Sequence, residues 1–297
     1  MKELVVISGK GGTGKTSIVA ALAALANNKV LADCDVDAAD LHLVLEPEIK
    51  LREDFSGGKI ASVEVDRCIG CGQCLEVCRF KAVAPDGPCN EKGQFTHEID
   101  PIACEGCGVC VWNCPVKAIK FESKVNGEIY TSQTRHGAMV HARLGAAEEN
   151  SGKLVTEVRK KAVAMAAKEG VELVIIDGSP GVGCPVIASI TGASLILVVT
   201  EPTQSGMHDM LRVLDLAEGF KIPSMVVVNK SDLNADVVRL MEEELSKRDI
   251  PIIGQVPYDD DFTRAQLEMK SVVEYSDSKA SSEIRSIWQR IEERLNA

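Results

Sequence analysis

A short segment near the start of the chain, Gly9-Lys10-Gly11-Gly12-Thr13-Gly14-Lys15-Thr16, has the residue types that bind a chain of phosphates. An apolar run precedes it and an alanine-rich stretch follows it, which predicts a strand, a loop and a helix in that order. Glycines let backbone N–H groups point at phosphate oxygens, and the N-terminus of the helix adds positive potential. Lys15 would neutralise the terminal phosphates, and the Thr16 hydroxyl, next to Ser17, would bind Mg²⁺.

Acidic residues follow two of the other apolar runs. The run Leu173–Ile176 ends in Asp177 and a Gly-Ser-Pro-Gly turn, so Asp177 would hold the Mg²⁺ shell through water. Four more acids lie in the segment DCDVDAAD, and they are Asp33, Asp35, Asp37 and Asp40. Carboxylates this close repel one another unless a cation or solvent relieves them. We expect Asp37 and Asp40 to cap a helix rather than to take part in catalysis.

Eight cysteines form two runs of identical spacing, with an interval of 36 residues between the first cysteines of the two runs. The runs are Cys68-x₂-Cys71-x₂-Cys74-x₃-Cys78 and Cys104-x₂-Cys107-x₂-Cys110-x₃-Cys114. This spacing is typical of bacterial ferredoxins, in which three cysteines of a run hold one [4Fe–4S] cluster and the fourth holds the other. Two ligand sets follow, Cys68, Cys71, Cys74 and Cys114 for one cluster, and Cys104, Cys107, Cys110 and Cys78 for the other.

Zinc is the alternative metal for these cysteines. C-x₂-C pairs do bind zinc, but eight thiolates in two such runs exceed what tetrahedral zinc sites need. One position departs from the ferredoxin pattern, because Arg79 follows Cys78 where that pattern has proline. We interpret Cys89 as a free thiol in a Pro-Gly turn, and Cys34 and Cys184 as small buried side chains without a metal role.

Hydrophobic periodicity predicts an α/β fold. Short apolar runs without alternation are expected as strands buried on both faces, namely Leu4–Ile7, Val30–Ala32, Leu173–Ile176, Leu195–Val199, Met225–Val228 and Ile250–Ile253. Helical stretches separate them, namely Thr16–Ala26, Leu154–Glu169, His208–Gly219 and Ala235–Arg248. The expected architecture is a mostly parallel P-loop NTPase sheet flanked by helices.

The cysteine-rich stretch breaks this pattern and has no long helix. We expect a small α+β domain of the bacterial ferredoxin type at 57–121, inserted into a discontinuous nucleotide-binding domain at 1–56 and 122–297. Ile119–Ser123 and Glu128–Gln133 flank Asn126-Gly127, which predicts a tight β-hairpin at that point. No internal repeat is evident beyond the two cysteine motifs.

Composition excludes several classes of protein. The 297 residues carry 33 basic and 44 acidic side chains, a net charge of −11, which argues against binding nucleic acid. No apolar run approaches the length of a membrane span, and the C-terminal apolar stripe of Ile284, Ile287, Trp288 and Ile291 is expected to pack on the sheet. The N-terminus lacks the features of a signal peptide, and 11 cysteines, an odd number, do not suit a disulfide framework. We therefore expect a cytoplasmic protein.

The phosphate loop contains a second lysine, Lys10, and this residue indicates one particular class of phosphate-binding loop. The segment GKGGTGKT resembles the phosphate loop of the MinD/ParA/CobQ class of ATPases, which includes the nitrogenase iron protein, and the resemblance covers the entire chain. It implies Mg²⁺-dependent ATP hydrolysis by a nucleotide-sandwiched dimer, in which Lys10 reaches the partner's phosphates. It also implies that Asp35 lies near Mg²⁺ and the attacking water. In a monomer, Lys10 would be only a local phosphate contact.

The residues that bind the base are expected near the end of the chain. Asn229 and Asp232, in the sequence Asn-Lys-Ser-Asp, resemble the guanine-binding motif of GTPases, and Asn229 also matches the asparagine that MinD-type ATPases place against adenine. Pro257 and Tyr258 match the family's loop that covers the base. The phosphate loop favours ATP, with GTP as the alternative.

Together these features favour an ATPase that couples nucleotide state and dimerisation to electron transfer through two [4Fe–4S] clusters to a partner protein. The dimer would be a homodimer or a heterodimer with a paralogue. Two alternatives stay open: an ATP-dependent scaffold or carrier of iron–sulfur clusters, and a positioning ATPase whose clusters sense redox state. No nucleic-acid partner is expected, and a membrane partner is disfavoured.

Overall fold

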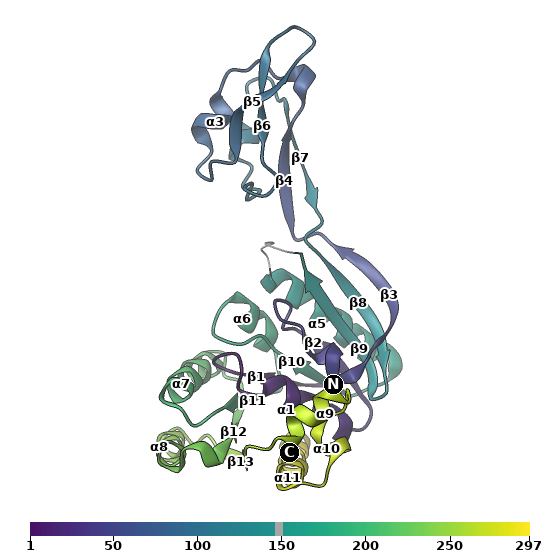
Figure 1. Ribbon diagram of the computed structural model, residues 1–297, viewed down its shortest axis with the longest axis vertical. Coiled ribbons are helices and arrows are strands. Elements are labelled where there is room, and N and C mark those ends of the chain that lie inside the picture. The colour runs from purple at the N-terminus through teal and green to yellow at the C-terminus, as the bar shows by residue number, and fades with distance from the viewer. Residues whose placement is uncertain (146–150) are drawn as a thin grey trace. The chain divides into compact units, whose positions relative to one another are not determined.

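The computed structural model describes residues 1–145 and 151–297, and its chain forms two compact units (Figure 1). The first unit comprises Met1–Glu53, Glu128–Leu144 and Ser151–Ala297, and the second comprises Asp54–Gly127 with Gly145. The second unit extends a few residues beyond the inserted domain proposed at 57–121. Part of the difference at the second boundary follows from strand pairing, because the strand that closes the unit extends to Lys124, which pairs with Gly58.

A mixed sheet forms the centre of the first unit. Its order is β13 (Ile252–Val256), β12 (Ser224–Asn229), β11 (Leu195–Thr200), β1 (Lys2–Ile7), β10 (Leu173–Asp177), β2 (Lys29–Asp33), β9 (Gly137–Leu144), β8 (Gly127–Thr134) and β3 (Glu48–Phe55). The neighbours from β13 to β9 are parallel, which confirms the mostly parallel sheet. β13 begins later than the apolar run predicted, after Pro251, which has no N–H to donate to a ladder.

Helices cover both faces of this sheet. The longer ones are α1 (Lys15–Leu25), α5 (Ser151–Glu169), α7 (Gln204–Gly219), α8 (Ala235–Ser246) and α11 (Lys279–Asn296). The shorter ones are α2 (Leu41–Leu45), α6 (Cys184–Ile190), α9 (Asp261–Leu267), α10 (Val272–Tyr275) and the 3₁₀ turn η2 (Ser231–Leu233). α1 and α11 pack on one face, whereas α5, α6 and α7 pack on the other.

The apolar stripe of α11 is part of the core, as the sequence predicted. Ile284, Ile287 and Ile291 are fully buried and Trp288 is nearly so. They join the cluster that contains alternate residues of β1 and β11. The continuous apolar runs of β2, β10 and β11 follow from burial on both faces.

The second unit contains two small antiparallel sheets and two one-turn helices (Figure 1). β4 (Gly58–Val63) pairs with β7 (Ile119–Lys124), and β5 (Val83–Cys89) pairs with β6 (Phe95–Ile99). The remaining elements are η1 (Val65–Arg67), α3 (Gln73–Val77) and α4 (Val109–Asn113). The buried cluster of this unit contains small and medium side chains, Ala61, Cys74, Ala82, Val83, Ile99 and Ile119.

The internal repeat is longer than the cysteine motifs, contrary to the sequence interpretation. At the interval of 36 residues, β4 corresponds to β6, α3 to α4, and β5 to β7. Backbone conformation repeats as well, since Lys81 and Lys117 have φ angles of 54° and 51°. The first strand of each half pairs with the last strand of the other, which gives the unit a pseudo-twofold plan.

The hairpin predicted at Asn126-Gly127 is wrong. β7 pairs with β4, whereas β8 belongs to the large sheet. Asn126 instead joins the two strands at which the chain enters and leaves the second unit. Its side-chain oxygen accepts N–H groups of Gly57 and Gly58 at 3.0 and 2.9 Å. Its own N–H donates to the Phe55 carbonyl at 2.8 Å.

In the first unit, an ion pair connects the turn between β8 and β9 to α10. Arg135, between β8 and β9, donates two hydrogen bonds to the Glu274 carboxylate of α10, at 2.8 and 3.0 Å. Arg135 also donates a hydrogen bond to the Val44 carbonyl, at the end of α2, at 3.1 Å. Burial opposes ionisation of Glu274, but hydrogen bonds from Arg135 and Ser271 outweigh it and lower the pKa of Glu274 to about 2.

Replacing Glu274 by Gln is expected to lower the free energy of unfolding by roughly 1–3 kcal/mol at pH 7. A depressed pKa stabilises the fold above the pKa of the unfolded chain, so the difference from wild type should shrink below about pH 4.5 and vanish near pH 2. Urea unfolding at several pH values measures it. Glu292→Gln, at an exposed position of α11, is the control. A difference that grows on acidification would contradict this account.

Candidate functional site

The loop between β1 and α1 lines an open cavity of about 480 Å³. Ser8, Gly11–Ser17, Asp35, Ala38, Asp40, Leu43, Val44, Pro180, Thr263, Gln266 and Leu267 form its wall. Gly14 precedes α1 with a φ of 87°, and a Cβ at this position would lie 2.3 Å from the Asn229 side chain. Only glycine fits this turn, which points the first N–H groups of α1 toward the cavity.

Two acids converge on the buried lysine of the loop. The Lys15 ammonium forms an ion pair with Asp177 and lies 3.4 Å from Asp35. The Thr16 hydroxyl donates to the other oxygen of Asp177 at 2.9 Å. Burial disfavours the charge of Lys15, but Asp177 and Asp35 outweigh it and raise the pKa of Lys15. The structure thus brings together these four residues, which the sequence singled out from three separate segments.

Asp33 organises the loop that carries Asp35, a role that the sequence did not indicate. Its fully buried carboxylate accepts the N–H groups of Asp35 at 3.1 Å and Leu41 at 3.3 Å. Burial, and then the charge of Asp177, raise the pKa of Asp33 well above its usual value. The cap expected from Asp40 is wrong, because its side chain makes no capping hydrogen bond and Asp33 binds the first N–H of α2 instead.

Lys10 makes an ion pair within its own chain. Its ammonium lies 2.7 Å from Glu201, which directly follows β11, and donates to the Ser205 hydroxyl at 3.0 Å. Lys230 binds the other oxygen of Glu201 at 3.0 Å and the Gly12 carbonyl at 3.0 Å. Burial works against ionisation of Glu201, but hydrogen bonds from both lysines lower its pKa. The sequence analysis missed Glu201, whose one signal is an acid at the end of a buried strand.

The predicted base-binding residues fall into two groups. Asn229 is buried, and its side-chain amide donates to the Thr13 carbonyl at 2.8 Å, so it supports the phosphate loop. Asp232 and Tyr258 lie together, because the Asp232 carboxylate accepts the Tyr258 N–H at 2.7 Å. The Tyr258 side chain is exposed, next to Pro257.

Helix α9 contributes cavity residues that nothing in the sequence indicated. Thr263, Gln266 and Leu267 line the cavity, and the Gln266 amide donates to the Ser17 hydroxyl at 2.9 Å. These residues follow the last strand and carry no motif. Packing of α9 against α10 brings them to the phosphate loop.

The loop after β10 is hydrogen-bonded to its neighbours on both sides. The Ser179 hydroxyl donates to the Cys34 carbonyl at 2.7 Å, and the Gly181 N–H donates to the Ser8 carbonyl at 2.8 Å. Cys34 is fully buried, as expected, and burial raises the pKa of its thiol. Cys184 is exposed, contrary to expectation, because it begins α6 at the surface.

Two cavities in the second unit are lined by the cysteines in the predicted crossed sets. The first cavity contains Cys68, Cys71, Cys74 and Cys114. The second cavity contains Cys104, Cys107, Cys110 and Cys78. The sulfur atoms that cross over accept backbone N–H groups at equivalent positions, from Ala118 to Cys114 at 3.2 Å and from Ala82 to Cys78 at 3.4 Å.

These cavities suit a multinuclear group better than a single ion. Zinc–sulfur bonds are about 2.3 Å, so a zinc site needs its sulfur atoms almost in contact. Within residues 1–145 and 151–297, no three His, Cys, Asp or Glu side chains are close enough to hold one metal ion. The lining of each cavity includes four thiols, which is the number of cysteine ligands that a cubane cluster takes.

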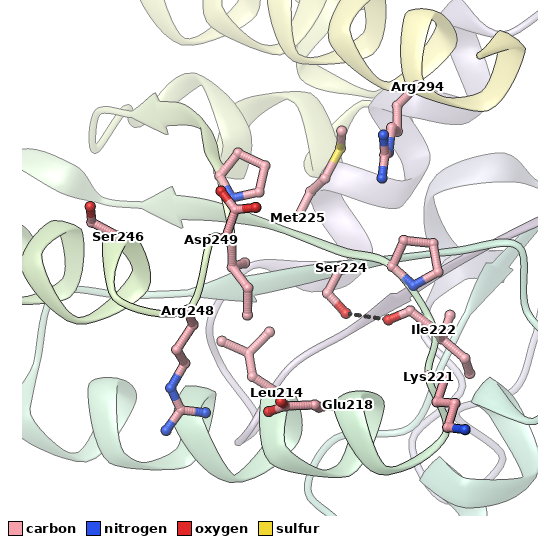
Figure 2. Close-up of a pocket in the computed structure, with 13 residues that line it drawn as sticks. Leu214, Glu218, Lys221, Ile222, Ser224, Met225, Ser246, Arg248, Asp249 and Arg294 are labelled. Atoms are coloured by element: carbon pink, nitrogen blue, oxygen red, sulfur yellow. Dashed lines mark hydrogen bonds between the residues drawn. The ribbon is translucent and has the colours of Figure 1, made fainter.

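A hollow of about 790 Å³ lies at the other end of the strands (Figure 2). Figure 2 shows Glu218 and Lys221 near the end of α7, Ser224 and Met225 at the start of β12, and Arg294 on α11 around it. Ligands of open α/β sheets bind at the carboxyl ends of the strands, and this hollow is at the amino ends of β12 and β13. The cavity at the phosphate loop is therefore the candidate site.

A known family matches most of the chain. Residues 4–272 match the CobQ/CobB/MinD/ParA nucleotide binding domain. The chain belongs to this nucleotide-binding family. A relative is the uncharacterized protein MJ0578 of Methanocaldococcus jannaschii, 34% identical over 294 residues, which are 98% of this chain and 96% of the relative.

Solved structures show the same fold. The MinC:MinD cell division protein complex of Aquifex aeolicus aligns with a TM-score of 0.58 and 18% identity, over 99% of this chain and 96% of that chain. The septum site-determining protein MinD of Pyrococcus horikoshii, complexed with Mg-ADP, aligns with a TM-score of 0.59 and 16% identity, over 99% and 97%. In the part of this MinD/ParA-family chain that is described, no helix is long and apolar enough to cross a bilayer.

Replacing Glu201 by Gln is expected to lower the free energy of unfolding by about 1 kcal/mol, because Lys10 and Lys230 lose a shared, partly buried counter-ion. Urea unfolding at low and at high salt measures the change, which should shrink as salt screens the pairs. Glu172→Gln, at an exposed position before β10, is the matched control. Equal losses in the two variants would argue against the bridging role of Glu201.

Proposed function

We propose that this protein is a Mg²⁺-dependent ATPase whose second unit holds two [4Fe–4S] clusters, and that nucleotide state controls electron transfer through them to a partner protein. One observation carries the proposal. Eight cysteines line two cavities in crossed sets of four, in a chain whose first unit has the family's phosphate-binding loop. The acceptor would be a protein that carries a one-electron redox centre.

The geometry around Lys15 supports ATP hydrolysis. A terminal phosphate would replace Asp177 as the partner of the Lys15 ammonium, which leaves the Asp177 carboxylate to hold the water shell of Mg²⁺. The Thr16 hydroxyl, which now donates to Asp177, would bind the ion directly. Asp35, 3.4 Å from the Lys15 ammonium, would lie beside the attacking water. The Mg-ADP of the Pyrococcus horikoshii relative favours an adenine nucleotide over GTP.

The base would lie near the loops that follow β12 and β13. A hydrogen bond between Asp232 and Tyr258 connects these two loops. Asn229 fixes the position of the phosphate loop relative to β12, and Pro257 and Tyr258 follow β13, the neighbouring strand. The exposed Tyr258 ring is available to cover an adenine. α9 closes the other side of the phosphate cavity with Gln266 and Leu267.

Dimerisation would use Lys10. In this chain its ammonium is held by Glu201, and the side chain is only partly buried. A second ATP-bound subunit, either another copy or a paralogue, would offer phosphates that compete with Glu201 for Lys10. The exchange of one anion for another makes dimerisation depend on nucleotide. Cell division MinD of Aquifex aeolicus, a structural relative, forms a complex with MinC, which fits a role that depends on a partner protein.

Linkage between the two units would run along the chain. The loop of Asp33 and Asp35 precedes α2 and β3, and β3 leads into the second unit. A change at this loop on hydrolysis can therefore act on the segment that carries the cysteines. When bound, each [4Fe–4S] cluster would take up and release one electron.

The clusters are tested on anaerobically purified protein by iron and sulfide analysis and by electron paramagnetic resonance after reduction. We expect two cubane clusters per chain and a change in the signal when MgATP is added. Cys74→Ser and Cys110→Ser should each lose one cluster, because each thiol lines one cavity. Cys89→Ser, an exposed cysteine outside both ligand sets, is the control and should keep both. Colourless protein without iron or sulfide would refute the proposal.

ATP hydrolysis is tested with two lysine variants. Lys15→Ala should lose nucleotide binding, whereas Lys10→Ala should keep binding but lose hydrolysis that rises with protein concentration. Fluorescent-nucleotide titration and phosphate release separate the two effects. Lys221→Ala, at the hollow far from the phosphate loop, is the matched control. Unchanged hydrolysis in Lys10→Ala would remove the dimer from the mechanism, and transfer of intact clusters to an apo-protein would replace electron transfer by cluster delivery.

A further inference from the structure

The two cysteine cavities of the second unit are built from equivalent positions of the repeat. At the interval of 36 residues, each cysteine of the first cavity corresponds to one of the second. Most of the other lining residues also correspond and stay similar in character, namely Val63 and Ile99, Gly72 and Gly108, Val116 and Phe80, Ala118 and Ala82, and Ile119 and Val83. Because the frame repeats so closely, the positions that differ stand out.

Among the positions that line both cavities, three pairs change polarity; Arg79, which corresponds to Pro115 of the first cavity, is exposed and does not line the second. His97 of the first cavity corresponds to Ala61 of the second. Gln73 of the first corresponds to Val109 of the second, and Ile69 of the first corresponds to Glu105 of the second. The first cavity therefore has two additional hydrogen-bond donors, and the second has an additional carboxylate. All three differences favour negative charge in the first cavity.

His97 is the residue that carries the argument. It lies on β6, is only 7% exposed, and has a buried Nδ1 without a hydrogen-bond partner among the described residues. Its Nε2 faces the loop between Cys71 and Cys74, since a Cβ at Gly72 would lie 4.0 Å from it. No described residue forms a hydrogen bond with the His97 ring, so its Nε2 can carry the N–H toward a ligand in the first cavity. A cluster sulfide or a cysteine sulfur would accept the imidazole N–H.

The other two differences act in the same direction. Gln73 begins α3 beside Cys74 and offers an amide N–H, whereas Val109 at the start of α4 offers none. Glu105 follows Cys104 directly, so its carboxylate lies near the second cavity and repels additional negative charge there. Gln73 and Glu105 are exposed, so solvent weakens their effect relative to that of His97.

We propose that His97 donates a hydrogen bond to the first cluster and thereby sets its reduction potential above that of the second. Reduction adds one negative charge, and a nearby N–H stabilises the reduced form more than the oxidised form. One electron would then pass from the second cluster to the first. This transfer would oxidise the second cluster and reduce the first. The proposal rests on the proposed function, because it requires both clusters to be bound.

A redox titration of the anaerobic holoprotein, followed by electron paramagnetic resonance, tests this order. Wild type should reduce in two resolved steps, which requires about a tenfold difference in the equilibrium constant, or ~59 mV for a one-electron couple. His97→Phe, which keeps a ring but has no N–H, should lower the higher step and leave the lower one unchanged. His97→Gln, which restores a donor, should return part of the shift.

Glu105→Gln provides an independent test of the order of the two potentials, because this exposed side chain can be replaced without disturbing the core. It should raise the lower step and leave the higher one in place, so the two variants assign the steps to the two cavities. Iron and sulfide contents equal to wild type show that a shift is not loss of a cluster. A single step in wild type, or a His97→Phe shift confined to the lower step, would overturn the proposal. Protein without iron and sulfide would instead refute the clusters themselves, before any titration.

Discussion

The site depends on the electrostatic balance around one buried ammonium group. Lys15 lies at the carboxyl ends of β1, β2 and β10, where Asp35 and Asp177 compensate its charge and Asp33 is buried alongside. A buried charge without partners costs several kcal/mol, so these carboxylates keep the lysine in place when no phosphate does. In the proposed mechanism, the same carboxylates would become available to a metal when a phosphate binds Lys15. That mechanism is an exchange of anions around a fixed cation.

A second exchange of the same kind involves Glu201. This carboxylate binds Lys10 and Lys230, and Lys230 also binds the phosphate loop through the Gly12 carbonyl. The lysine implicated in dimerisation is thereby tied to the loop that would hold its own nucleotide. In the proposed dimer, a triphosphate, which carries more negative charge than one carboxylate, would compete with Glu201 for Lys10. Both steps of the proposed cycle replace a carboxylate by a phosphate.

The second unit depends on a different constraint. Its buried side chains are few and small; Cys74 is one of them, and four partly buried cysteines pack against this cluster, namely Cys78, Cys104, Cys110 and Cys114. A domain of this size has too little apolar area to stabilise itself without a cross-link or a metal. The repeated backbone explains how cysteines distant in sequence share a cavity, because the last strand of each half pairs with the first of the other. The same symmetry makes His97 and Glu105 visible as deviations, and the proposed order of reduction potentials is argued from them.

By itself the sequence determined the phosphate loop, the parallel sheet and the two cysteine sets, because each depends on local spacing or on periodicity. Tertiary structure alone decided the partners that come from distant segments. Glu201 and Gln266 carry no motif; the pairing of β11 with β1 brings Glu201 to the loop, and the packing of α9 brings Gln266 there. Asn126 was misjudged because the turn preference of Asn-Gly is weaker than the pairing of β7 with β4. Long-range contacts decided these positions because no local pattern encodes which strands become neighbours.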